Sequence, residues 1–145
     1  MASKKLPIFA LLLAGCSTAD PRRSLGELGW HPETDQPIRQ LQEVLEATEQ
    51  HQPRNYTSSN LGFVYDAKLY ILFRQYLDAI DVGARGAALE EQGSWLHRRR
   101  EAVSIAYSEY QGGTLASYVE NKAFIDLTKL RIAEIEARMP RGELP

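Results

Sequence analysis

The apolar positions of this chain recur every three or four residues over most of its length, which is the spacing of amphipathic helices. The first such segment runs from Asp35 to about Gln50, where an acid followed by Pro37 is typical of a helix start. Residues 51–62 are rich in proline, asparagine and serine, and we expect a loop there. From Leu61 to Ile80 a single apolar stripe predicts a second helix, with Leu69, Leu72, Phe73, Tyr76, Leu77 and Ile80.

Glycines separate the remaining periodic segments. Residues 82–86 contain two glycines, which either break the helix or bend it. A third helix is expected from about Ala87 to Tyr110 and is ended by Gly112-Gly113, and Thr114 is expected to cap a fourth helix that stops at Pro140. No alternating run of β-branched residues indicates a strand. The predicted fold is therefore all-α, a small antiparallel bundle of about four helices.

The first fifteen residues have the composition of an export signal. Lys4 and Lys5 form a basic start, and the apolar run after them would span about 14 Å as a helix, well short of the roughly 30 Å of a bilayer core. The run ends in Leu13-Ala14-Gly15-Cys16, the pattern of a lipobox, with cleavage after Gly15 and a lipid on the Cys16 thiol. An ordinary signal peptide that happens to contain a cysteine is the alternative interpretation.

This pattern predicts the order of the segments and the cellular location of the domain. Residues 1–15 form the signal peptide, 16–35 a flexible tether, 36–140 the helical domain and 141–145 a short tail. Ser17, rather than an aspartate, follows the lipidated cysteine and favours the outer membrane of a bacterial envelope, with the domain facing the periplasm. Two or three acyl chains hold a protein durably, so a membrane anchored through lipid is the first expected partner.

The net charge and the cysteine content limit the kinds of partner and of chemistry that we expect for the domain. The formal charge of −2 becomes −4 when the segment carrying Lys4 and Lys5 is removed, because no acid precedes Cys16. A mildly acidic domain is a poor candidate for binding nucleic acid and a fair one for binding a basic protein. Cys16 is the only cysteine, so its lipidation leaves neither a disulfide partner nor a thiol nucleophile.

Catalytic chemistry is not indicated by the residue pattern. His31, His51 and His97 lack the spacing of metal ligands, and there is no G-x-S-x-G elbow or phosphate-binding glycine loop. Asp78 and Asp81 lie three residues apart, which is more often a solvated helix face than an acid–base pair. We therefore expect no enzyme, no cofactor and no metal site.

Two surface patterns each have a structural and a functional interpretation. The basic run 97–100 points to all sides of a helix, which favours a soluble surface with ion pairs over an anion site. Several tyrosines fall at helical spacings, where half-buried packing is favoured over an aromatic contact surface. These tyrosines are Tyr70, Tyr76, Tyr107, Tyr110 and Tyr118.

Three sequence elements in the region from about Leu61 to Met139 carry a family resemblance. They are Gln92-Gly93-Ser94-Trp95-Leu96-x-x-Arg99, Tyr110-x-Gly112-Gly113-Thr114 and Leu127-Thr128-x-x-Arg131-x-x-Glu134-Ile135. An earlier acid–aliphatic–aromatic pattern matches Asp66, Leu69 and Phe73. With these elements the chain resembles the lysozyme-inhibitor LprI-like family of small exported bacterial proteins.

The resemblance implies structural roles for the motif residues, which are Gln92, Trp95, Leu96, Arg99, Thr128 and Arg131. Trp95 and Leu96 would fill the space between helices, and Thr128 would bond back to its own helix. Arg99 and Arg131 would bridge to acids or carbonyls across the bundle. The family usually carries cysteines where this chain has Val103 and Ala123, so packing is expected to replace a disulfide worth roughly 2–4 kcal/mol.

The resemblance also implies a function, the inhibition of lysozyme by an acidic surface that docks on the cationic enzyme. The candidates for that surface are Asp66, Asp78, Asp81, Glu90 and Glu91. The alternative is a structural or accessory lipoprotein that binds an envelope protein complex and inhibits nothing.

Overall fold

The computed structural model describes residues 32–110 and 113–140, and Gly15, Cys16 and the short tail lie outside the described residues. The described residues form four α-helices and one short 3₁₀ turn, with no strand among them. The elements are α1 (Asp35–Ala47), α2 (His51–Ala79), η2 (Val82–Ala84), α3 (Arg85–Ser108) and α4 (Thr114–Arg138). The predicted all-α fold is confirmed.

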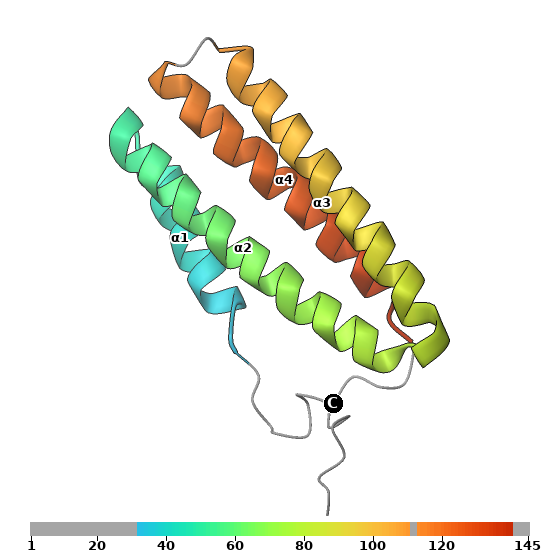
Figure 1. The fold of residues 1–145 in the computed structure, drawn as a ribbon. Coiled ribbons are helices and arrows are strands. Elements are labelled where there is room, and N and C mark those ends of the chain that lie inside the picture. The colour runs from blue at the N-terminus through green and yellow to red at the C-terminus, as the bar shows by residue number, and fades with distance from the viewer. Residues whose placement is uncertain (1–31, 111–112, 141–145) are drawn as a thin grey trace, which may run out of the picture.

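Consecutive helices run in opposite directions along one bundle axis, so α2 and α4 point the same way (Figure 1). The most extensive packing is between α2 and α4, and α4 also packs along α3. α1 lies against α2, on the part of the bundle away from α3 (Figure 1). α4 is therefore the central helix, with α2 and α3 on either side of it.

The apolar core is built by α1, α2 and α4. Its buried members are Ile38, Leu61, Tyr65, Leu69, Phe73, Leu77, Ile125, Ile132 and Ile135. α3 contributes only partly buried apolar groups, Ala88 and Trp95, and its one buried residue is the polar Gln92. Hydrophobic burial therefore fixes three helices well, while α3 needs other contacts to hold it in place.

The loop expected over residues 51–62 is wrong, because α2 begins at His51. Pro53 stands in the first helical turn, where its missing N–H removes no intrahelical bond. The polar residues that suggested a loop are used inside the bundle: Asn121 of α4 donates to the Asn55 carbonyl at 3.1 Å and to Ser58 Oγ at 3.0 Å. Ser58 is fully buried, so these hydrogen bonds attach α2 to α4 where a hydrophobic contact would be usual.

Two expected helix caps are also replaced. Glu33, not Asp35, accepts hydrogen bonds from the first backbone N–H groups of α1, at 2.6 and 3.0 Å. Asp35 is instead the first residue of the helix and pairs with Lys68 of α2 at 2.8 Å. At the start of α4 the N-cap residue is Gly113, and Thr114 is the first helical residue.

The glycine-containing segment 82–86 breaks the helix and does not merely bend it. α2 ends at Ala79 and α3 starts at Arg85, with η2 between them. The Asp81 carboxylate accepts the Gly83 N–H at 2.7 Å, which satisfies a backbone donor at the turn. The break turns the chain back on itself, so that α3 runs opposite to α2 (Figure 1).

The core assignment predicts a sharp difference between two apolar residues of α4. Ile135 is 1% exposed and Leu130 is 63% exposed. Ile135→Ala is expected to lower the free energy of unfolding by about 2–5 kcal/mol, since it leaves a cavity, whereas Leu130→Ala is expected to change it by less than about 0.5 kcal/mol. Urea unfolding followed by circular dichroism measures both, and equal losses would contradict the described core.

Candidate functional site

Arg99 lies where α2, α3 and α4 meet. Its Nη1 donates to Asp66 Oδ1 at 2.6 Å and to Thr128 Oγ1 at 3.0 Å, so one guanidinium of α3 is bonded to both other helices. The same group stacks over the Phe124 ring at 4.2 Å and over the Trp95 ring at 4.9 Å. The largely buried cation is thus surrounded by one carboxylate, one hydroxyl and two aromatic faces.

Thr128 links this cluster to the backbone of α4. It is fully buried, and its hydroxyl donates to the Phe124 carbonyl at 2.6 Å while it accepts from Arg99. The hydrogen bond from Thr128 to its own helix, which the family resemblance implied, is therefore present. Both hydrogen-bonding functions of the hydroxyl are used, which lets a polar side chain sit in the interior at little cost.

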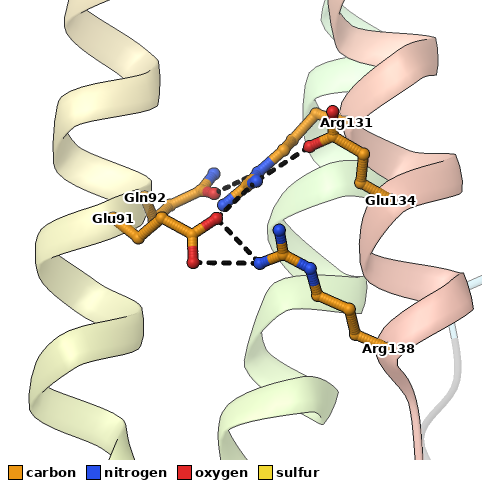
Figure 2. A network of polar contacts seen from close by, with 5 residues as sticks. All are labelled: Glu91, Gln92, Arg131, Glu134 and Arg138. Carbon is orange, nitrogen blue, oxygen red and sulfur yellow. Dashed lines mark hydrogen bonds and ion pairs between the residues drawn. The ribbon is translucent and has the colours of Figure 1, made fainter.

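Arg131 forms a second polar cluster between α3 and α4 (Figure 2). Its side chain is 4% exposed; Nε donates to Gln92 Oε1 at 2.9 Å, and Nη1 donates to Glu91 and Glu134 at 2.9 Å each. Arg138 Nη1 contacts both Glu91 oxygens, at 2.7 and 2.9 Å. The bridges across the bundle expected of Arg99 and Arg131 are both present.

The carboxylates of the second cluster remain about half exposed, so the network of charged groups extends from the buried Arg131 guanidinium to the solvent. The hydrogen bond from Arg138, followed by the one from Arg131, holds the pKa of Glu91 below its usual range. Trp95 lies near both arginines, with the Arg131 guanidinium 5.7 Å from its ring. The two clusters hold α3 in place through polar and aromatic contacts.

The remaining motif residues divide into buried and exposed ones. Gln92 is buried, and Trp95 packs half-buried against the apolar core. Leu96 is 38% exposed, so the expectation that it fills the space between helices is wrong. One residue turns a helix by about 100°, and with Trp95 against the core Leu96 faces the edge of the interface. Val103 and Ala123 are half-buried on the two packed helices.

The five candidate acids do not form one surface. Asp66 and Glu91 are bonded to arginines of the two clusters, and Asp81 accepts the Gly83 N–H. Twelve residues, about 18 Å of helix, separate Asp66 from Asp78. Asp78 and Glu90 are exposed, with no ion pair among the described residues. Asp78 near the end of α2, Asp81 before η2 and Glu90 near the start of α3 flank the turn from α2 to α3, and we refer to these three residues as the acidic group. Arg85 of the same turn contacts the Asp78 carbonyl at 3.5 Å.

An open hollow of about 340 Å³ lies between the upper halves of α3 and α4, and the sequence did not single it out. Its lining is Leu96, Arg99, Arg100, Val103, Ser104 and Tyr107 from α3 with Glu120 and Phe124 from α4. Phe124 packs against Gly62 of α2, where a Cβ would stand 3.3 Å from the ring. The sequence pattern that could have indicated the hollow is the spacing of Leu96, Val103 and Tyr107, which lie seven and four residues apart. A buried core face of a helix has the same spacing, so the pattern does not distinguish the two.

Over residues 32–110 and 113–140 no group of three histidine, cysteine or acidic side chains is placed to hold a metal ion. His97 pairs with Glu101 at 3.2 Å on the surface. In the same residues no helix combines the length and the apolar character needed to cross a bilayer. No family model, curated protein or solved structure matches this chain, and the resemblance to the LprI-like family stays a prediction.

The Glu91 cluster predicts a pH-dependent contribution to stability. Because the folded pKa of Glu91 lies below its unfolded value, its stabilisation is complete above the unfolded pKa and is lost as pH falls through the folded pKa. Glu91→Gln is expected to cost about 1 kcal/mol near neutral pH and progressively less toward about pH 3. Unfolding by urea across this range measures the difference.

Glu90→Gln is the matched control for this prediction, since Glu90 is the exposed neighbour with no ion pair among the described residues. Its unfolding free energy is expected to follow that of the unchanged protein at every pH. A Glu91→Gln deficit that stays constant from pH 7 to pH 3, or one that the Glu90 variant shares, would contradict the role given to the cluster.

Proposed function

We propose that this chain is a non-enzymatic helical lipoprotein, anchored to the bacterial outer membrane, that binds another protein in the α3–α4 hollow. The lipobox ending at Cys16 supports the anchor. The hollow is the observation that supports binding, because it combines an apolar wall, an exposed phenol and an exposed guanidinium at the surface. Tyrosine and arginine are enriched where proteins bind each other.

The chemistry of the hollow indicates what part of a partner it receives. Leu96, Val103 and Phe124 provide apolar contact, and about 340 Å³ accommodates one or two side chains. Arg100 lines the hollow and has no ion pair among the described residues, whereas Arg99 already holds Asp66. The best fit is an amphipathic segment that inserts an apolar side chain and places a carboxylate on Arg100.

A pull-down from detergent-solubilised membranes tests this surface. The double variant Arg100→Ala/Tyr107→Ala is expected to weaken recovery of a co-purifying envelope protein by at least tenfold, because both side chains line the hollow. Arg98→Ala/Ile105→Ala is the matched control, since both residues are exposed on α3 and outside the lining. Equal recovery with both doubles, each shown to be folded, would sink the proposed site.

A second candidate function, the inhibition of lysozyme, is supported by the acidic group at the turn from α2 to α3. Asp78, Asp81 and Glu90 are exposed there, and no ion pair involves them among the described residues. A basic enzyme is a chemically suitable partner for such a group. The resemblance to the LprI-like family points to the same partner.

Lysozyme turnover on cell walls measures this second candidate. Micromolar purified protein without its lipid is expected to inhibit, less so at high salt, and the triple variant Asp78→Asn/Asp81→Asn/Glu90→Gln is expected to lose most of the inhibition. Glu43→Gln/Glu46→Gln/Glu49→Gln removes three exposed acids at the other side of the domain and is the control. Absence of inhibition by folded protein rules this candidate out.

A further inference from the structure

α2 carries three exposed aromatic side chains at intervals of seven residues. Tyr56 is 73% exposed, Phe63 70% and Tyr70 66%. Seven residues are nearly two helical turns, so the three rings follow one face of α2 over about 21 Å. We call these three residues the aromatic row. Single exposed apolar side chains are ordinary, but an aligned set is typical of a surface that contacts another molecule.

Between Tyr56 and Tyr70, the face of α2 that carries the aromatic row has no unpaired charge, and the next charged residue along this face is the exposed Arg74, one turn beyond Tyr70. Between Tyr56 and Tyr70 the only charged residues are Asp66 and Lys68. Asp66 is bonded to Arg99 and Lys68 is bonded to Asp35, so both are neutralised within the chain. In a two-fold dimer a surface meets its own copy, where net charge of one sign would repel. A neutral aromatic face is compatible with this self-pairing.

We propose that the aromatic row is the contact surface for a second copy of this chain, with the two α2 helices antiparallel about a two-fold axis at Phe63. The row is symmetric about its centre, since Phe63 is seven residues from each tyrosine. Such an axis sets Phe63 against Phe63 of the second copy and Tyr56 against the second copy's Tyr70. It also sets Ser59 against Ala67, small residues that let the helices approach closely.

The area of the aromatic row indicates how tightly the copies associate. A fully covered aromatic side chain buries about 150–250 Å², so at two-thirds exposure the row offers roughly 300–500 Å² per copy. A standard interface buries about 800 Å² per partner. Even with the flanking side chains added, the dimer is expected to be weak, with a dissociation constant in the micromolar range. The row shares no residue with the α3–α4 hollow, so this inference goes beyond the proposed function.

Sedimentation velocity tests the dimer on the mature chain with Cys16→Ser, so that neither lipid nor thiol joins two copies. Between about 1 and 200 µM the protein is expected to pass from monomer to dimer. Phe63→Glu places two like charges at the axis and is expected to raise the dissociation constant at least 100-fold. Leu130→Glu, an equally exposed apolar position on α4, is the matched control and is expected to leave it unchanged.

The antiparallel arrangement has a test of its own. Tyr56→Lys alone and Tyr70→Glu alone are expected to weaken the dimer, and the two together in one chain are expected to restore it, because position 56 meets position 70 of the second copy. Circular dichroism checks that each variant is folded, and Phe63→Ala, expected to weaken the dimer tenfold or more, replaces Phe63→Glu if that variant is not folded.

A chain that stays monomeric to 200 µM, or a dimer that Phe63→Glu and Phe63→Ala leave intact, overturns the proposal. A dimer that is lost in both single tyrosine variants but not restored in the double one overturns the antiparallel pairing. Monomeric protein that co-floats with phosphatidylcholine vesicles through Phe63 also overturns it, since the row would then contact lipid.

Discussion

Two buried arginines set the conditions for the rest of this structure. A guanidinium keeps its proton in a protein, so burying one costs several kcal/mol unless acceptors surround it. Arg99 is met by a carboxylate of α2 and a hydroxyl of α4, and Arg131 by carboxylates of α3 and α4 and by the Gln92 amide. Because these acceptors come from three helices, the position of α3 is fixed by where two charges can be neutralised.

Because α3 is held mainly by polar and aromatic contacts, part of its apolar surface stays available for binding. α1, α2 and α4 share an apolar core, whereas α3 has one buried residue and is attached through polar and aromatic contacts. Apolar side chains that a core helix would bury, such as Leu96 and Tyr107, therefore remain at the surface beside α4. The hollow between the two helices is a consequence of how α3 is attached.

The helical pattern could be predicted from the sequence, because it follows from residue type and spacing along the chain, and the bridging arginines were expected from the resemblance to the LprI-like family. The start of α2 could not, because Ser58 and Asn55 satisfy their hydrogen bonds with Asn121, sixty-three and sixty-six residues away. Leu96 was predicted wrongly for a related reason, since periodicity does not show which side of a stripe the neighbouring helix covers. The contacts of Phe124 with Arg99 and of Arg138 with Glu91 could not be predicted either, because they depend on how α3 packs on α4.

Because α1 and α2 run in opposite directions, the start of α1 points toward the end of the bundle that carries the turn from α2 to α3 (Figure 1). Asp35 pairs with Lys68, eleven residues before the end of α2, so α1 starts beside the middle of α2. On the proposed anchor at Cys16, a protein that docks on Asp78, Asp81 and Glu90 would meet the domain on the side that faces the membrane, with eighteen residues, Ser17–Thr34, between Cys16 and Asp35. The hollow beside Tyr107 lies toward the opposite end and is open to partners too large to enter the space on that side.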